Sequence, residues 1–216
     1  MLRLTNLCVT VSGAELIRNV SMHIPPNSFV ALVGRNGAGK TTLMRSIMNI
    51  LPAASGEIHF AGESTTKAAP FTYAWKGVGY MPEDRRLVDN WTVEENILLP
   101  AWATQRSEAA SRLSDVYELI PEVAAFAHRK ALQLSGGQQK LVALARAILI
   151  GQRLLLLDEP FEGVAPALGQ RLSEILGNLR HQLNMSVLIS ESDLIHSRDL
   201  VDRVFIIERG VVRLER

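Results

Sequence analysis

Hydrophobic and polar residues alternate over residues 2–11 and again over residues 16–24. A period of two is typical of strands with one buried face, so two such strands are predicted, joined near Ser12 and Gly13. Residues 28–33 form a short continuous apolar run, which indicates a buried strand that ends at a glycine-rich loop. The next segments predict a strand, a polar loop and another strand, at residues 56–62, 63–75 and 77–83.

Apolar residues recur at helical spacing from Val93 to about Phe126, and Pro100 and Pro121 punctuate that run. Further helices are predicted from their apolar spacing, at residues 40–50, 135–150, 166–182 and 193–199. The apolar runs between these helices predict the remaining strands, at residues 153–159, 185–190, 204–208 and 211–215.

Strands that alternate with helices in this way indicate an α/β fold, with a mainly parallel sheet covered on both faces. The helical block over residues 87–150 lies between strands of that sheet. We therefore predict an inserted helical subdomain within a single domain that covers residues 1–216. The two strands joined by a short turn at the N-terminus predict a smaller antiparallel β-subdomain beside it.

Composition narrows the classes of protein that the chain can represent. Its 216 residues suffice for one substantial core, and 47% apolar with 21% charged residues suit an ordinary globular protein. The net charge of +1 gives no basic field to attract nucleic acid. A single cysteine, Cys8, excludes an internal disulfide framework and fits a reducing compartment.

No signal peptide is expected, because the N-terminus leads directly into alternating residues. The richest apolar segment, residues 141–157, is interrupted by Arg146 and Arg153, so we do not expect it to span a membrane. If the protein works at a membrane, we expect it to do so through a partner.

A glycine-rich loop follows the buried strand and precedes a predicted helix. Residues 34–41 read GRNGAGKT and fit the pattern G-x-x-x-x-G-K-[ST], in the strand–loop–helix context that this motif requires. Glycines let backbone N–H groups turn inward around phosphates, and the helix N-terminus adds its dipole. Lys40 is expected to reach the β- and γ-phosphates, and Thr41 is expected to ligate Mg²⁺. The predicted nucleotide contacts in this loop are Gly34, Arg35, Asn36, Gly37, Ala38, Gly39, Lys40, Thr41 and Thr42.

An acidic pair ends a second buried strand. Four leucines, residues 154–157, precede Asp158 and Glu159, which places the pair at the carboxyl end of a parallel strand, where ligands of such sheets bind. Asp158 is predicted to be the second Mg²⁺ partner, and Glu159 to be the general base that orients the attacking water. Acidic residues at strand ends are common, so the assignment depends on the glycine loop as well.

A third motif, LSGGQ at residues 134–138, opens a predicted helix. Ser135 is a natural N-cap, and Gly136 and Gly137 leave backbone N–H groups bare, which suits either an anion site or a plain helix start. The five residues resemble the signature of ABC-type ATPases. This resemblance covers essentially the whole chain, since the phosphate loop, the signature and the Asp-Glu strand follow one another in the family's order. It implies a P-loop NTPase core of the ABC ATPase type, which binds and hydrolyses ATP.

The same resemblance implies partners. In that family two ATPase domains pair head to tail, and ATP lies between the phosphate loop of one domain and the signature of the other. Ser135, Gly136, Gly137 and Gln138 are then expected to contact the nucleotide of a second ATPase subunit, in a homodimer or a heterodimer. ABC ATPases that act on DNA or ribosomes usually carry inserted arms, tandem domains or a basic surface, so no nucleic acid is expected here.

Two segments resemble one branch of the family. Residues 79–85 carry Glu83 where most members have glutamine, and residues 160–166 (PFEGVAP) lack the usual Ser-Ala-Leu-Asp. Both are similar to ATPase subunits of importers for branched-chain (hydrophobic) amino acids and for urea. Sugar importers share Pro-Glu-Asp-Arg, but their ATPases are usually tandem chains of about twice this length. By this resemblance Glu83 is a candidate contact for the nucleotide and for Mg²⁺.

An importer subunit of this kind implies a location and further partners. The resemblance places the chain in the cytoplasm, peripheral on the inner face of the cell membrane. It would be attached there through transmembrane permease subunits, which work with a separate solute-binding protein.

Two departures from the family bear on activity. The aromatic residue that usually stacks on adenine is replaced by Val11, and no Phe, Tyr or Trp precedes Phe29. The histidine that usually senses the γ-phosphate is replaced by Ser192, whose hydroxyl can donate one hydrogen bond. His196 follows one helical turn later as an alternative donor. A nucleotide-binding subunit with weak hydrolysis, acting as the regulatory partner in a heterodimer, is therefore the second functional expectation.

Overall fold

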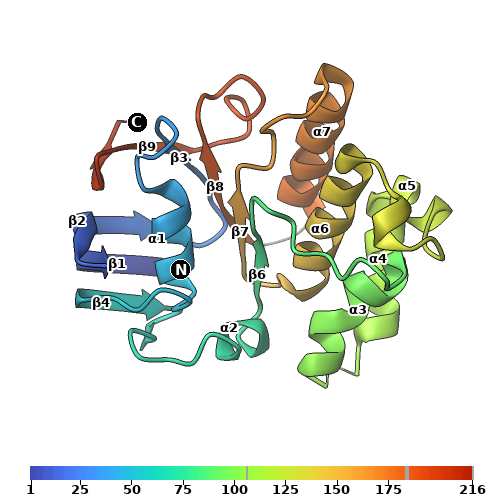
Figure 1. Ribbon diagram of the computed structural model, residues 1–216, viewed down its shortest axis with the longest axis horizontal. Coiled ribbons are helices and arrows are strands. Elements are labelled where there is room, and N and C mark those ends of the chain that lie inside the picture. Colours follow the sequence, from blue (N-terminus) through green and yellow to red (C-terminus); the bar gives the residue numbers. More distant parts are fainter. Residues whose placement is uncertain (106, 183–184, 216) are drawn as a thin grey trace.

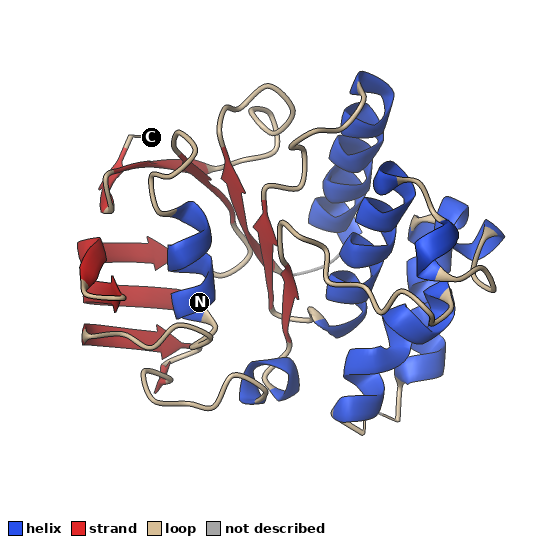
Figure 2. Ribbon diagram, in the orientation of Figure 1, coloured by secondary structure: helices blue, strands red, loops and turns tan. Residues whose placement is uncertain are grey.

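The computed structural model describes residues 1–105, 107–182 and 185–215. A small sheet lies at one side of the molecule, a larger sheet lies in the middle, and most helices lie at the other side (Figure 1, Figure 2). The strands are β1 (Leu2–Val11), β2 (Ala14–Ile24), β3 (Phe29–Val33), β4 (Ser55–Phe60), β5 (Glu63–Ser64), β6 (Val78–Met81), β7 (Leu154–Asp158), β8 (Ser186–Glu191), β9 (Arg203–Glu208) and β10 (Val211–Leu214). The helices are α1 (Lys40–Ile47), α2 (Thr72–Trp75), α3 (Val93–Ala103), α4 (Ala109–Leu119), α5 (Pro121–Ala125), the 3₁₀ helix η1 (Ala131–Gln133), α6 (Gly136–Ile150) and α7 (Pro166–Gln182).

The small sheet is antiparallel, with the strand order β2-β1-β4-β5. Leu2 in β1 pairs with Ile24 in β2 and with Phe60 in β4. Buried and exposed side chains alternate along β1, as the period of two predicted. Asn6 has a φ of 49° at an irregularity in the register, and this extra residue keeps Leu7 on the buried face.

The larger sheet has the strand order β10-β9-β3-β8-β7-β6. Its neighbouring strands from β9 to β6 are all parallel, and β10 pairs antiparallel with β9. The prediction of a mainly parallel sheet is therefore confirmed. Because the strands are parallel, their carboxyl ends meet at one edge of the sheet, and this edge positions the candidate site.

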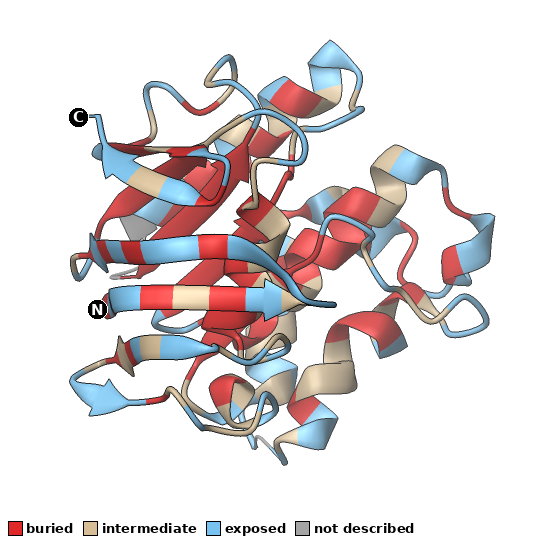
Figure 3. Cartoon of the chain, turned by 60° about the vertical axis from the view of Figure 1, so that its left-hand side comes forward, coloured by how far each residue is buried: buried red, intermediate tan, exposed pale blue. Residues whose placement is uncertain are grey.

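Both faces of the larger sheet are covered. Leu154 and Leu156 pack in one core with α1 and the small sheet, whereas Leu155 and Leu157 pack in a second core with α6 and α7. Figure 3 shows the strands behind the small sheet as buried, while much of the outer face of the small sheet is exposed. Burying one such leucine fully contributes about 1.5–3 kcal/mol, so the four leucines fix β7 firmly in the sheet.

Helices α3, α4 and α5 pack on α6, and their buried residues belong to the same core as the larger sheet. Thr92 caps α3, because its hydroxyl accepts the N–H of Glu95 and the Glu95 carboxylate accepts the N–H of Thr92. Pro100 does not interrupt the helix as predicted, since α3 continues to Ala103. Proline lacks the backbone N–H that would bond to the carbonyl oxygen of residue 96, so α3 continues past Pro100 with one backbone hydrogen bond fewer.

Helix α1 ends earlier than predicted, at Ile47. Asn49 adopts a φ of 53°, and the N–H of Ile50 reaches the carbonyl oxygen of Arg45 at 2.9 Å, which is typical of a helix C-terminus. The loop predicted at residues 63–75 also contains two short elements, β5 and α2.

The helix predicted at residues 193–199 is wrong, because residues 193 and 194 have no regular structure and residues 195–199 form turns. The side chain of Asp193 accepts the N–H of Ile195 at 3.0 Å, and such a local bond competes with helix formation. Among the described residues, no helix combines the length and the hydropathy needed to cross a bilayer.

Candidate functional site

The glycine loop over residues 34–39 joins β3 to α1 at the carboxyl edge of the larger sheet. Gly39 has a φ of 112°, a conformation that residues with side chains rarely adopt. A Cβ on Gly34 would lie 2.4 Å from the carbonyl oxygen of Ile207, so a side chain there would push the loop away from β9. The loop therefore brings bare backbone N–H groups to the N-terminus of α1, which carries a positive partial charge.

Lys40 folds back across this loop and is only 4% exposed. Its Nζ donates to the carbonyl oxygens of Gly34 at 2.5 Å and Arg35 at 3.1 Å. The same Nζ lies 2.9 Å from Oε1 of Glu159. The ammonium group is thus held inside the loop, where it would meet phosphate oxygens.

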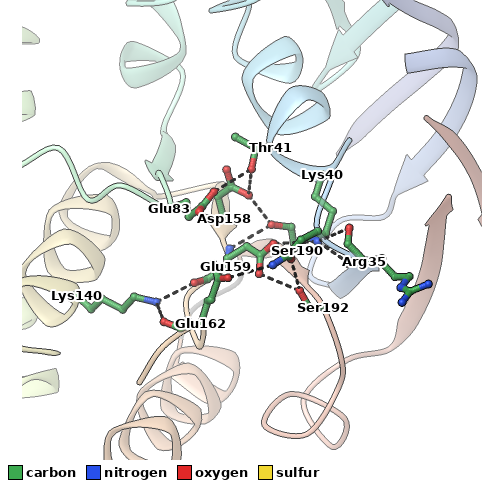
Figure 4. Close-up of polar contacts among 12 residues, drawn as sticks. Arg35, Lys40, Thr41, Glu83, Lys140, Asp158, Glu159, Glu162, Ser190 and Ser192 are labelled. Atoms are coloured by element: carbon green, nitrogen blue, oxygen red, sulfur yellow. Dashed lines mark hydrogen bonds and ion pairs between the residues drawn. The ribbon is translucent and has the colours of Figure 1, made fainter. Parts of the chain in front are cut away.

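Four oxygen-bearing side chains converge beside Lys40, from α1 and from the ends of β6, β7 and β8 (Figure 4). Thr41 Oγ1 lies 3.3 Å from Asp158 Oδ1 and 3.4 Å from Glu83 Oε2. Ser190 donates a hydrogen bond of 2.6 Å to Asp158 Oδ1. Asp158 is fully buried, and this burial raises the pKa of its carboxyl.

This set of oxygen atoms fits Mg²⁺, which proteins usually bind through one or two carboxylates together with substrate phosphates. A nearby cation would also stabilise the charged form of the buried Asp158 carboxylate. Among the described residues, no group of three or more His, Cys, Asp or Glu side chains is arranged to hold a metal.

Glu159 follows Asp158 in a left-handed conformation, with a φ of 51°. Such a conformation is uncommon for residues other than glycine, and it recurs at functional sites. The N–H of Glu159 bonds to the carbonyl oxygen of Ser190 at 3.1 Å, and the residue is 6% exposed. This backbone geometry turns the carboxylate toward Lys40 and the glycine loop (Figure 4).

Lys140, on α6, holds the loop that follows Glu159. Its Nζ donates to the carbonyl oxygens of Glu159 at 3.0 Å and Pro160 at 3.1 Å, and also to that of Glu162. Burial lowers the pKa of Lys140, and the negative charges of Glu162 and Glu159 oppose this effect. The contact fixes the acidic pair relative to α6.

Ser192 lies just after β8, with its hydroxyl 2.9 Å from Asn36 Oδ1 and 3.3 Å from Glu159 Oε2. The His196 ring stacks on Phe161, with the two ring centroids 5.2 Å apart. Ser192 and His196 line the same hollow of about 340 Å³ beside the glycine loop. Ser192 thus contacts Glu159 directly, whereas the His196 ring is engaged with Phe161.

The glycine loop opens into a cavity of about 570 Å³, a size typical of ligand pockets. Its walls are formed by Glu15, Leu16, Arg18, residues 36–42, Glu83, Glu159, Glu162, Arg209 and Gly210. Val11 is not among these residues, and no described aromatic residue lines the cavity. Sequence reasoning missed Leu16, Arg18 and Arg209, because these residues belong to no phosphate-binding motif. They line the cavity because the folded sheets bring β2 and the end of β9 beside the glycine loop.

The signature residues lie at the start of α6. Ser135 caps this helix, since its hydroxyl accepts the N–H of Gln138 at 3.3 Å while Gln138 Oε1 accepts the N–H of Ser135 at 3.0 Å. Ser135, Gly136, Gly137 and Gln138 do not line the cavity at the glycine loop. The structure therefore does not bring the two predicted anion-binding motifs together within one chain.

The loop after Glu83 is attached to α6 by two arginines. Arg85 Nη1 donates to the carbonyl oxygen of Gly136 at 3.3 Å. Arg146 donates to the carbonyl oxygen of Arg86 at 2.8 Å and also to that of Arg85. Arg85 and Arg86 have positive φ values of 61° and 49°, so the loop is held in an uncommon conformation.

Comparisons with known proteins agree with this arrangement. Residues 17–162 match the family model described as ABC transporter. The chain is 31% identical over 212 residues to a probable branched-chain amino acid transport ATP-binding protein, LivF, of Archaeoglobus fulgidus, covering 98% of this chain and 90% of the relative. It is 35% identical over 206 residues to the aliphatic sulfonates import ATP-binding protein SsuB of Pseudomonas entomophila, covering 95% and 72%.

Solved structures are similar over the whole fold. The dimeric structure of MJ0796, a bacterial ABC transporter cassette, has a TM-score of 0.90 at 25% identity and covers 100% of this chain and 98% of that chain. The fold and the site define a phosphate-loop ATPase cassette. The chain belongs to the ABC transporter family, and it is an ATP-binding and ATP-hydrolysing subunit of that family.

Proposed function

We propose that the chain powers an importer for branched-chain (hydrophobic) amino acids or a related small solute, through separate membrane subunits. One observation supports the hydrolytic role above all: Lys40, Asp158 and Glu159 converge at one edge of the sheet, with Lys40 Nζ 2.9 Å from Glu159 Oε1. The solute class is supported by the likeness to LivF. In this proposal residues 1–216 form a single ATPase domain, with a helical subdomain over about residues 87–150.

In the proposed mechanism the glycine loop and α1 hold the phosphates of ATP, and Lys40 binds the β- and γ-phosphate oxygens. Thr41, Glu83 and Asp158 would hold Mg²⁺, which neutralises the charge that develops on the phosphoryl group. Glu159 accepts the proton of the attacking water. Its φ of 51° and its burial keep the carboxylate fixed, so little reorganisation is needed.

The signature residues have their proposed role in a dimer. Because Ser135, Gly136, Gly137 and Gln138 lie away from the cavity of their own chain, they are available to contact the nucleotide of a second ATPase subunit. The likeness to the dimeric MJ0796 structure supports this arrangement. Each nucleotide would then be enclosed by residues of two chains.

Exposed aromatic side chains provide a proposed attachment to permease subunits. Trp91 and Trp102 lie with their ring centroids 6.2 Å apart, and Phe71 and Trp75 lie 5.5 Å apart. All four are at least 37% exposed on the segments that include α2 and α3. Tryptophan is enriched among the residues that anchor protein interfaces. This attachment would place the chain, together with a solute-binding protein on the other side, at the inner face of the cell membrane.

A regulatory role is the second candidate. Ser192 stands 3.3 Å from Glu159 Oε2, where the resemblance expects a histidine that donates to the γ-phosphate. A serine side chain is short, so it reaches a phosphate through water rather than directly. The chain would then bind ATP, hydrolyse it slowly and act beside a faster partner in a heterodimer.

The binding part of the proposal is tested by Lys40→Ala. Removing a charge-assisted donor costs about 1.5–3 kcal/mol, so ATP affinity should fall by roughly 10- to 100-fold in a calorimetric titration. Lys67→Ala is the matched control, since Lys67 is exposed and does not line the cavity. Equal ATP affinity in the wild type and in Lys40→Ala would contradict the assignment. Co-purification with the membrane subunits, followed by solute-stimulated phosphate release, tests the importer role.

A further inference from the structure

One wall of the cavity carries two arginines and a leucine but no aromatic ring. Leu16 and Arg18 belong to β2, and Arg209 lies in the turn between β9 and β10. Leu16 is 39% exposed, so an apolar surface faces the cavity opening. Figure 1 shows β2 and β9 on the side of α1 that faces away from α6 and α7.

A network of backbone contacts fixes this wall against the glycine loop. The N–H of Gly210 donates to the carbonyl oxygen of Ala38 at 2.9 Å, and the N–H of Arg18 donates to that of Gly210 at 2.8 Å. A Cβ on Gly210 would lie 2.1 Å from the carbonyl oxygen of Leu16. The turn between β9 and β10 is therefore packed between β2 and the glycine loop. This packing keeps Arg209 beside Leu16 and Arg18.

The strand order decides which part of a nucleotide meets this wall. Strand β9 lies on one side of β3, whereas β8, β7 and β6 lie on the other side. The candidate general base and Mg²⁺ ligands lie at the carboxyl ends of β7 and β6: Asp158 ends β7, Glu159 follows it, and Glu83 follows β6. A triphosphate with its γ-phosphate at these carboxylates would run along the glycine loop and place its base toward β2 and the β9–β10 turn.

The guanidinium groups on this wall suit a flat, electron-rich ring. Arginine has a planar cation that stacks on aromatic rings. The Arg209 side chain makes no hydrogen bond or ion pair within residues 1–105, 107–182 and 185–215. Arg18 Nε donates to the carbonyl oxygen of Glu15 at 3.4 Å and lies 3.9 Å from the Glu15 carboxylate, and the Arg18 side chain is 55% exposed. The Arg209 guanidinium and the remaining donors of Arg18 are therefore available to a ligand.

We propose that Leu16, Arg18 and Arg209 form the platform for the nucleotide base, and that this platform accepts adenine and guanine alike. The inference rests on the proposed function, because it concerns the same bound nucleotide. Strong discrimination between ligands requires buried polar groups that would be left unpaired by the wrong one. The carboxylate of Glu15 is the polar acceptor of this wall, but it is 53% exposed and already faces Arg18.

The test is a titration of wild-type protein and the double variant Arg18→Lys with Arg209→Lys against ATP, GTP and inorganic tripolyphosphate. Lysine keeps the positive charge and removes the planar group. Affinity for ATP and GTP should fall by about two- to fivefold for each arginine replaced, while tripolyphosphate affinity stays unchanged. Arg3→Lys is the matched control, because Arg3 is an exposed arginine of the same sheet that lies outside the cavity.

Three results would overturn the inference. They are unchanged ATP affinity in the double variant, an equal loss for tripolyphosphate, and a wild-type preference between ATP and GTP of more than roughly tenfold. If the wild type binds none of the three ligands, the proposed ATPase function itself fails, which separates the two outcomes.

Discussion

At position 192 a serine hydroxyl approaches the candidate general base from the end of β8. Its contacts are with Glu159 Oε2 at 3.3 Å and Asn36 Oδ1 at 2.9 Å. An imidazole at this position would extend further toward the γ-phosphate. Since a direct donor to transition-state charge is worth roughly 100- to 1000-fold in rate, Ser192→His should accelerate phosphate release, by up to about 100-fold.

The control for this prediction is His196→Ala, measured in the same steady-state assay. The His196 ring stacks on Phe161, so its removal should change the rate much less than the substitution at position 192. A wild-type rate near the median enzyme value of about 10 per second, with no gain from Ser192→His, would refute this account. A large loss in His196→Ala would instead make His196 the donor.

Glu191, at the end of β8, makes the stability of the folded protein depend on pH. It is 5% exposed, Oε1 has no hydrogen-bond partner among the described residues, and burial raises its pKa to about 8. The negative charges of Asp193 and Glu159 contribute to this increase in the pKa. As pH rises above 4.5, the unfolded chain releases this proton before the folded chain does. Stability is therefore lost progressively between about pH 4.5 and pH 8.

Glu191→Gln should remove this loss. The difference in Tm between the variant and the wild type should grow in favour of the variant as pH rises from 5 to 8. Thermal unfolding at several pH values measures it, and Glu57→Gln, at an exposed carboxyl of β4, is the control. A difference in Tm that stays constant with pH would show that Glu191 ionises normally in the folded protein.

Some residues of the site could be predicted from sequence and others could not. Lys40 and Asp158 belong to motifs whose residues are adjacent in the chain, so local spacing identifies them. Ser190, which donates to Asp158 at 2.6 Å, comes from strand β8, and Arg209, which lines the cavity, follows strand β9. Their proximity depends on pairing between strands far apart in sequence, and a single sequence does not reveal that pairing.

Strand β6 and helix α6 approach each other closely at Gly79. A Cβ on Gly79 would lie 2.0 Å from the carbonyl oxygen of Ala147, which is backbone and cannot turn away. Gly79→Ala should therefore force α6 off the sheet and destabilise the protein by about 1–3 kcal/mol, measured by chemical denaturation.

Gly177→Ala is a control with the opposite expected sign. In α7 the nearest atom to an added Cβ at Gly177 is a Leu200 methyl carbon at 3.7 Å, an ordinary contact. Alanine in a helix interior is favoured over glycine by roughly 0.5–1 kcal/mol, so this variant should be slightly more stable. Equal stability of Gly79→Ala and the wild type would mean that β6 and α6 are not tightly packed.

Elements with a strong local pattern could be predicted, and those decided by neighbours could not. The helix at residues 166–182 and the buried strand at residues 28–33 follow from spacing and apolar runs alone. The segment at residues 193–199 has helical spacing but a side chain at Asp193 that bonds to the backbone instead. Strand order likewise depends on tertiary packing rather than on local pattern.

For the molecule as a whole, the signature residues 135–138 lie away from the nucleotide cavity of their own chain. This separation predicts that two ATPase chains associate when ATP is bound. Glu159→Gln should retain the phosphate contacts, stop hydrolysis and trap ATP, and the trapped nucleotide should favour a dimer. Light scattering with ATP should show a dimer for this variant and mainly monomer for Lys40→Ala. Monomer at all protein concentrations with Glu159→Gln would argue against a homodimer and in favour of a different partner chain.

The ion pair between Lys40 and Glu159 adds a consequence for that variant. At 2.9 Å the carboxylate binds the same ammonium group that the phosphates of ATP require, so it acts as an intramolecular competitor for that group. In the wild type, ATP must displace the Glu159 carboxylate from Lys40. The measured binding free energy is therefore reduced by the free energy of that ion pair. Glutamine carries no charge and competes weakly. A nucleotide that cannot be hydrolysed should therefore bind Glu159→Gln more tightly than the wild type, before any effect of slowed turnover is counted.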